Sequence, residues 1–492
     1  MDNIVERINE CKDRAERFLL SLQLEDGVFD TSHYNNSKET GMLLAGTYDA
    51  VSALGLIKRL DSINKEKAKD FILSHRNSQG YYKIQEMRKK DLTYKDFEYD
   101  DFHVTNYSIS ALGYLSYPLS KKDLRFLKNY NSKRRLKKWL NQRDMEKPWM
   151  EGNFVVNLAS FFLLGRTLGL QPCEKRMEEL IAWHRENQDE FGYYHDPDIG
   201  DLTNAFAGAT HNYHIFYHDN LPIARYKTII DYLLTRSTDI ETACIDVDEV
   251  DVLCNFIKYG YRGDEIRAWL TKKLDSLLQF QNADGGFADQ IDGVRTFDGW
   301  TKYKEPQGIP NAFATWFRLI AIGMIAVTAY GDSDNWQFRN TIGIGYFNKD
   351  YLNNGFDPEK MREAERAVLQ RAEKRKANKT ADVAGSLNDD AVSDLVALFQ
   401  KRVETVEKSK LTFEASFSVN IISEGSFHLV IKDGDAKVDN GALQDANLTV
   451  TCKRDVLTKI VEGKMDAKLA YATGKLKCKG DIAYAFKLTV LM

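Results

Sequence analysis

Four carboxylic acids stand within six residues near the start of an apolar stretch of helical period, at Asp246, Asp248, Glu249 and Asp251. A helix turns about 100° per residue, so Asp248 and Asp251 share one face and Asp246 and Glu249 share a neighbouring one. Buried carboxylates are costly unless they are paired or protonated, although a helix N-terminus offsets part of that cost. Two acids close together at the same end of a helix are what a proton donor or a metal site requires. Burial and a like-charged neighbour raise a carboxyl pKa, which suits Asp248 to keep and then donate a proton.

Polar and aromatic residues also stand near the starts of the other apolar helices, and we expect them at the same end as the acids. His211 is the candidate for relaying protons to the acids. Arg318 is a candidate for binding a carboxylate or phosphate head group, or for pairing with Asp248 or Asp251. Each such residue, taken alone, also fits a hydrogen-bonded buried polar group. The remaining candidates for substrate binding are Tyr48, Asp49, His103, Tyr107, Asn157 and Trp316.

A repeat of two helices positions these residues and runs through the first 345 residues. The first helix of each pair has one apolar stripe. In four copies of the repeat this helix ends in a turn of glycine and an aromatic residue, at 17–30, 70–83, 182–196 and 275–289. Weaker copies of the repeat stand at 137–149 and 231–242. The second helix is apolar nearly all round, at 46–57, 102–115, 153–165, 204–217, 244–257 and 311–325. Amphipathic helices lie outside and wholly apolar ones inside. Six of each predict two concentric rings, an α6/α6 toroid.

The turns at 23–29 (QLEDGVF) and 281–287 (QNADGGF) resemble the QW-type repeats of the prenyltransferase and squalene cyclase superfamily, over about residues 1–345. The acid cluster resembles the DxDD motif of proton-initiated (class II) terpene cyclases. That resemblance implies Asp248 as the protonating acid with Asp246 as its support. Glu249 replaces the last aspartate of the motif, and the chain has one toroid where familiar class II cyclases have two. Protein prenyltransferases use an Asp-x-Cys zinc pair and a later histidine, whereas here Cys244 precedes Asp246, so we expect no metal.

The chain changes character after the repeat. Residues 351–390 read as a linker, with a charged helix at 357–377 and a flexible tether at 378–390. Residues 391–492 begin with an amphipathic helix and continue in alternating strands with a hairpin turn at Asp433-Gly434. This part resembles the sterol carrier protein type 2 domain in its KDG (432–434), DVLTKIVEGK (455–464) and GKLKCKGDIAYA (474–485) segments. The resemblance implies a five-stranded sheet around an apolar tunnel, lined by Phe413, Phe417, Phe427, Leu429, Tyr471 and Phe486.

We therefore expect a multidomain protein, with an all-α α6/α6 toroid at 1–350 and a small α+β lipid-binding domain at 391–492. The net charge of −4 argues against nucleic acid as the main partner. No run of 18 apolar residues appears, so we expect no stable membrane insertion, which leaves room for transient membrane contact through the C-terminal domain. The N-terminus lacks the apolar run of a signal peptide, and the six cysteines form no CxxC pair, which predicts a cytoplasmic protein. Nucleotide-binding motifs are absent, and we expect no cofactor.

Three hypotheses about function remain open. The first, which we favour, is an enzyme of the class II terpene cyclase type, an isomerase or lyase acting on an isoprenoid or other lipid. The second is a sugar-active α6/α6 hydrolase or lyase that uses Asp248 or Asp251 with His211 or Tyr213. The third is a non-catalytic lipid-binding or lipid-transfer protein. The cavity lining separates them, because a terpene needs aromatic and aliphatic walls, whereas a sugar needs carboxylates, amides and imidazoles.

Overall fold

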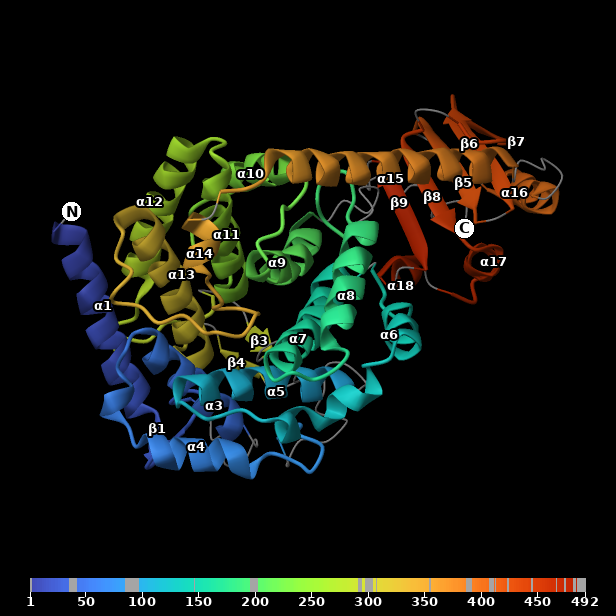
Figure 1. Cartoon of the computed structure of the whole chain (residues 1–492). Helices are drawn as coiled ribbons and strands as arrows, with labels where there is room; N and C mark the ends of the chain where they lie inside the picture. Colours follow the sequence, from blue (N-terminus) through green and yellow to red (C-terminus); the bar gives the residue numbers. More distant parts are fainter. Residues whose placement is uncertain are drawn as a thin grey trace. The chain divides into compact units, whose positions relative to one another are not determined.

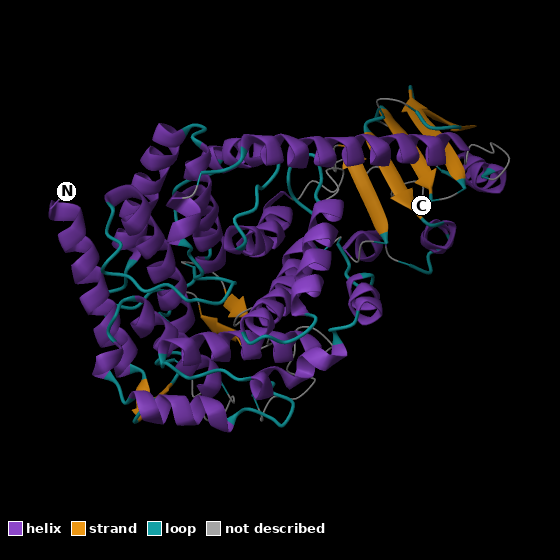
Figure 2. Cartoon of the chain, in the orientation of Figure 1, coloured by secondary structure: helices purple, strands orange, loops and turns teal. Residues whose placement is uncertain are grey.

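The architecture was obtained as a computed structural model and divides into two compact units, Met1–Leu369 and Gln370–Met492. Figure 1 traces the chain, and Figure 2 shows that helices make up most of it, with the larger sheet in the C-terminal unit. The structure describes residues 2–34, 42–84, 97–145, 147–194, 202–290, 294–296, 304–306, 308–353, 355–385, 392–406, 411, 413–422, 424–443, 446–465, 467–472, 475–480 and 484.

Six apolar helices form the interior of the first unit. They are α3 (Leu43–Leu56), α5 (Phe97–Tyr114), α7 (Pro148–Thr167), α9 (Leu202–His218), α11 (Ala243–Phe256) and α13 (Ala312–Tyr330). Each contacts the next in chain order, and α13 also contacts α3. Glycines allow the closest approach, because a Cβ on Gly208 of α9 would lie 2.2 Å from the Pro148 carbonyl oxygen of α7. Among the described residues, α13 is the helix whose length and hydropathy would allow it to cross a membrane, and 83% of that stretch is buried inside the protein.

Six further helices cover this interior, and all twelve helices expected from the repeat are present. They are α1 (Asp2–Ser21), α4 (Lys65–Ser74), α6 (Lys133–Leu140), α8 (Cys173–Asn187), α10 (Tyr226–Thr235) and α12 (Gly263–Phe280). Polar side chains cap several of their first turns. The Asn64 side chain accepts a hydrogen bond from the Lys67 amide at the start of α4, and Ser132 accepts one from the Arg135 amide at the start of α6. These helices bury mainly their apolar stripe, as amphipathic helices at a surface do, and α12 buries Lys273 as well.

The glycine turns after α1, α4 and α12 pack against another outer segment, which is α4, η3 (Lys121–Asn129) and α1 respectively. Gly27, Gly80 and Gly285 all have positive φ, of +80°, +97° and +98°. A Cβ at Gly27 would lie 2.5 Å from the Ala68 amide nitrogen of α4, and one at Gly285 would lie 2.2 Å from the Arg14 carbonyl oxygen of α1. Glycine is therefore required twice over, for its backbone conformation and for the space of its missing side chain. The last turn meets the first helix, since Gly285 belongs to the turn after α12.

A long helix, α15 (Pro358–Gly385), follows the short α14 (Lys349–Asn353). The helix expected at 357–377 is present, but it continues into residues where the sequence predicted a flexible tether. Residues 378–385 contain no proline and carry alanine and lysine, which favour helix, and a glycine stands at its end. The predicted domain limits at 350 and 390 stay a prediction.

The second unit is a small α+β domain with a mixed five-stranded sheet in the order β7-β6-β5-β8-β9, as expected. Its strands are β5 (Ala415–Ile421), β6 (Gly425–Lys432), β7 (Asp435–Asn440), β8 (Leu448–Cys452) and β9 (Leu476–Gly480). β5 pairs antiparallel with β6 and parallel with β8. Asp433 and Gly434, with φ of 53° and 76°, form the two-residue turn between β6 and β7 that the sequence predicted. The helices of this unit are α16 (Ser393–Thr405), α17 (Arg454–Val461) and α18 (Ala467–Ala472).

Short strands complete the first unit. They pair as β1 (Gln23–Glu25) with β2 (Val28–Phe29) and as β3 (Val294–Thr296) with β4 (Lys304–Pro306). Three 3₁₀ segments stand between helices, η1 (Leu60–Ser62), η3 (Lys121–Asn129) and η5 (Ile257–Tyr259).

Candidate functional site

Helix α11 carries the acid cluster, and all four carboxylic acids are buried, each at most 1% exposed. The helix begins where the Thr242 side chain accepts a hydrogen bond from the Ile245 amide. Neighbouring inner helices α9 and α13 and outer helices α10 and α12 surround it. The helix therefore holds its acids away from water on every side, and their charges must be balanced within the protein.

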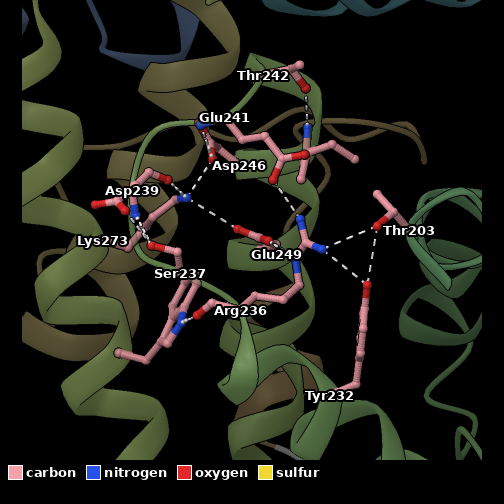
Figure 3. Close-up of polar contacts among 12 residues, drawn as sticks. Thr203, Tyr232, Arg236, Ser237, Asp239, Glu241, Thr242, Asp246, Glu249 and Lys273 are labelled. Atoms are coloured by element: carbon pink, nitrogen blue, oxygen red, sulfur yellow. Dashed lines mark hydrogen bonds and ion pairs between the residues drawn. The ribbon is translucent and has the colours of Figure 1, made fainter. Parts of the chain in front are cut away.

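Two of the acids, Asp246 and Glu249, face the outer helices and are ion-paired (Figure 3). The Lys273 ammonium of α12 lies between them, 2.5 Å from Asp246 Oδ1 and 3.2 Å from Glu249 Oε2. Arg236, just after α10, binds Glu249, and Arg318 of α13 binds Asp246. Burial lowers the pKa of Lys273, and the Glu249 carboxylate opposes that shift. These cations balance the charge of both carboxylates and join α11 to three other elements.

This placement changes the expected roles of two residues. Arg318 pairs with Asp246, not with Asp248 or Asp251, because Asp246 lies on the side of α11 that the guanidinium reaches. Its guanidinium also donates to the Asp289 carbonyl oxygen at 2.8 Å. That Asp246 supports Asp248 stays a prediction. In the structure Asp246 contacts Lys273, Arg318 and the Glu241 amide.

Asp248 lies on the opposite side of α11. At 100° per residue it is turned about 200° from Asp246, away from the ion-paired face. It is 0% exposed, and neither carboxyl oxygen has a hydrogen-bond partner among the described residues. Burial raises the pKa of Asp248 well above its usual range, and the negative charges of Asp251 and Glu249 raise it further. The carboxyl therefore favours its protonated form.

Asp251 lies beside Asp248 and binds a histidine of α9. His214 Nε2 is 2.9 Å from Asp251 Oδ2, and the Asn255 amide donates to Asp251 Oδ1 at 3.3 Å. His211, the candidate from the sequence, instead lies with Nδ1 2.6 Å from the Ala207 carbonyl oxygen. Burial lowers the pKa of His211 to about 3, so its imidazole is neutral. His214 stands one helical turn from His211, and that spacing was the signal for it in the sequence.

Four of the expected substrate-binding residues gather around Tyr107 of α5. Its ring centre lies 4.3 Å from His103, 5.5 Å from Tyr48 of α3 and 5.4 Å from Trp316 of α13, the last ring standing perpendicular. Aromatic rings in such contact present both faces and edges to a ligand. The structure thus brings these four residues together from three inner helices. Asp49, next to Tyr48 in α3, is fully buried.

Asn157 belongs to a separate polar network that the sequence analysis missed. It accepts a hydrogen bond of 2.6 Å from the Asn106 amide, whose oxygen accepts one of 2.6 Å from Arg339. Arg339 is 3% exposed, and its guanidinium also donates to the Ile344 carbonyl oxygen at 3.1 Å. Arg339 stands in a loop without periodicity, so no pattern pointed to it.

The lipid-binding candidates of the C-terminal unit divide by burial. Phe417, Phe427 and Leu429 are fully buried in its core, and Phe413 packs partly buried against that core. Tyr471 is 46% exposed, which argues against a place inside a tunnel. Phe486 lies outside the described residues. An open groove of about 660 Å³ lies elsewhere on this unit and is lined mainly by charged residues such as Lys453, Lys459 and Glu462.

The described residues contain no group of three histidine, cysteine, aspartate or glutamate side chains arranged to hold a metal ion. The arrangement of the acids on α11 explains why they do not form such a metal-binding group. Two of its carboxylates are turned to cations and two to the other side of the helix, so no three converge on one point.

Comparisons with known proteins concern mainly the C-terminal unit. Residues 395–492 match the model of the SCP-2 sterol transfer family. The curated "Hydroxysteroid dehydrogenase-like protein 2" of Mus musculus is 31% identical over 111 residues, which is 22% of this chain and only 19% of that protein.

Two solved structures are similar to parts of the chain. Sterol Carrier Protein 2 from Yarrowia lipolytica, in its apo form, is 23% identical over 20% of this chain and 86% of that one, with a TM-score of 0.16. The sec-alkylsulfatase Pisa1 from Pseudomonas sp. is 11% identical over 70% of this chain and 45% of that one, with a TM-score of 0.19. By the family match alone, the C-terminal part of the chain, residues 395–492, is an SCP-2 sterol transfer domain, a kind of domain that binds lipids.

Proposed function

We propose that the N-terminal unit is a proton-initiated isomerase or cyclase of the class II terpene cyclase type. Its substrate is an isoprenoid or a similar unsaturated lipid, which the SCP-2 domain of the same chain carries. One observation supports this above all others, namely the buried, unpaired carboxyl of Asp248 with its raised pKa. An acid that keeps its proton in an apolar interior is what protonation of an alkene requires.

The chemistry proceeds without a cofactor. The Asp248 proton is transferred to a carbon of the double bond, which leaves a carbocation on the lipid and a carboxylate on Asp248. The ring faces of Tyr107 and Trp316 stabilise such a cation electrostatically. Loss of a proton from another carbon of the lipid gives an isomer of the same mass, and Asp248 regains a proton from water or from the substrate.

The arrangement of the inner helices fits this role. Each contacts the next and the last contacts the first, which supports a closed α6/α6 toroid with Asp248 on the face of α11 turned from the outer ring. Joining the lipid-binding domain to the toroid in one chain raises the local concentration of substrate near the toroid. We further propose that the protein works in the cytoplasm and contacts membranes transiently through the C-terminal domain.

The test is mass spectrometry of lipids bound to the protein purified from cells supplied with polyprenyl lipids and sterols. Wild type, Asp248→Asn and the surface control Asp275→Asn are compared. A lipid of unchanged mass and new retention time in wild type and control, absent from Asp248→Asn, supports the proposal. The same unchanged lipid in all three proteins refutes the chemistry and leaves a carrier. Absence of bound lipid from all three proteins favours the alternative hypothesis of a sugar-active enzyme.

A further inference from the structure

A strongly basic surface covers two consecutive outer elements, η3 (Lys121–Asn129) and α6 (Lys133–Leu140), away from the acid cluster. The nine exposed cations of these elements form what we name the basic patch: Lys121, Lys122, Arg125, Lys128, Lys133, Arg134, Arg135, Lys137 and Lys138. The whole chain has net charge −4, so this concentration of positive charge is a local departure from its composition.

The two elements are held together as one surface. The Arg135 guanidinium donates to the Lys128 carbonyl oxygen at 2.6 Å, which ties α6 to the end of η3. Their apolar side chains turn inward, since Phe126, Leu136 and Trp139 are at most 5% exposed. The cations are therefore left on the outside by the same amphipathic pattern that anchors the elements.

Within η3 and α6, no exposed acid offsets this charge. Asp123, the acid within η3, is fully buried and binds Arg76 and the Ser120 hydroxyl. Glu98, behind the patch, accepts hydrogen bonds from Tyr130 and Trp139 on the inner side. Over the part of the chain that the structure describes, none of the nine cations forms an ion pair with a carboxylate. A cluster of this kind produces a positive potential that extends into the solvent.

We propose that the basic patch binds the anionic surface of a lipid membrane. Juxtaposed lysines and arginines bind anionic lipid head groups, each strengthening the association about fivefold. Two observations favour a membrane over a nucleic acid. The chain carries an SCP-2 domain, whose lipid ligands reside in membranes, and the aromatic rings of the patch, Phe126, Tyr130 and Trp139, are buried and offer no platform for stacking bases.

The binding is electrostatic and does not involve insertion, because the patch exposes no large apolar side chain. This inference does not rest on the proposed chemistry, and it assigns membrane contact to the helical unit in addition to the C-terminal domain. Its consequence is that the protein collects or delivers lipid at anionic membranes and leaves them as ionic strength rises.

The experiment is sedimentation of the full chain with vesicles of phosphatidylcholine alone or with about 30% phosphatidylserine. The patch variant carries Lys133→Gln, Arg134→Gln, Lys137→Gln and Lys138→Gln. The control variant has the same change of charge at exposed sites elsewhere, Lys67→Gln, Lys272→Gln, Lys360→Gln and Arg362→Gln. Both keep the SCP-2 domain, so any binding through it is common to all three proteins.

We expect wild type and control to bind the phosphatidylserine vesicles, to release them in 0.5 M salt, and to ignore the neutral ones. The patch variant lacks four cations, so at about fivefold for each it should bind roughly 600-fold more weakly. Equal binding by the patch and control variants overturns the proposal, as does equal binding of wild type to both vesicles. Tighter binding of wild type to polyuridylate than to the phosphatidylserine vesicles overturns the membrane as the partner. Circular dichroism of each variant establishes that loss of binding is not loss of fold.

Discussion

The protonated state of Asp248 has a thermodynamic consequence that can be measured without knowing a substrate. In the unfolded chain an aspartate titrates near pH 3.9, whereas burial raises the pKa of Asp248 well above that value in the folded protein. An acid shifted upward favours the folded state below its unfolded pKa. It opposes folding progressively as the pH rises toward its folded pKa, because only the unfolded chain can release the proton there. The opposition grows by about 1.36 kcal/mol for each pH unit of that interval.

Asp248→Asn removes this opposition. An amide has nearly the same shape as a protonated carboxyl and is also neutral, so the two proteins should have similar stability near pH 4. At pH 6 the variant should be more stable than wild type by up to about 2.7 kcal/mol, the limit set by the slope over two pH units. A mutation that stabilises the protein while abolishing its activity is the expected signature of an acid kept for chemistry.

Urea unfolding followed by tryptophan fluorescence is the appropriate assay. All seven tryptophans stand between residues 139 and 336, so their fluorescence reports on the N-terminal unit alone. Because each comparison is made at one pH, other titrating groups affect both proteins equally. A stability difference that does not change between pH 4 and pH 6 would refute the reasoning, since it would mean that Asp248 titrates normally in the folded protein.

Three further predictions concern packing and charge. Lys273→Met leaves two buried carboxylates short of a cation and should destabilise the N-terminal unit by about 3–5 kcal/mol in the same urea assay, whereas Lys272→Met, an exposed neighbour, should change it by less than about 0.5 kcal/mol. Gly208→Ala should cost about 1–3 kcal/mol through the clash with α7, and Gly113→Ala, which has open space, should instead stabilise α5 by up to about 1 kcal/mol; equal effects would contradict the close helix contact. Phe427→Ala should weaken the C-terminal unit by about 3–5 kcal/mol, seen as faster hydrogen exchange in β5 and β6 with unchanged exchange in α11.

The helices and their faces were predictable, while most partners across the fold were not. The 100° spacing correctly separated Asp246 and Glu249 from Asp248 and Asp251, because helical periodicity is local. Which cation meets which acid depends on how helices pack, and the sequence analysis paired Arg318 with the wrong carboxylates. The sequence did contain a signal for the missing partner, since Lys273 stands on the apolar stripe of α12 where a lysine needs a buried anion.

The glycine turns also show that local sequence patterns do not predict contacts between distant segments. The turn of glycine and an aromatic residue after α12 was predicted, and the positive φ of Gly285 is a conformation that glycine adopts readily. Its contact with Arg14 of α1 joins positions far apart in the chain, and no local pattern encodes that distance. Arg339 was missed for a related reason, because its loop has no period and its partner Asn106 lies far away in the chain, on α5.

The four acids of α11 can share one buried helix because each pair is neutralised in a different way. Asp246 and Glu249 bind cations from the outer helices and from the neighbouring inner helix. Their negative charge is therefore balanced on their own side of α11. Asp251 is held by His214, which leaves Asp248 with a negative neighbour and no donor of its own. If a cation also reached Asp248, that carboxyl would ionise and its proton would be lost to solvent. The segregation of positive charge to one side of α11 is therefore the condition under which Asp248 keeps its proton, and it gives the ion-pair network a part in the proposed chemistry.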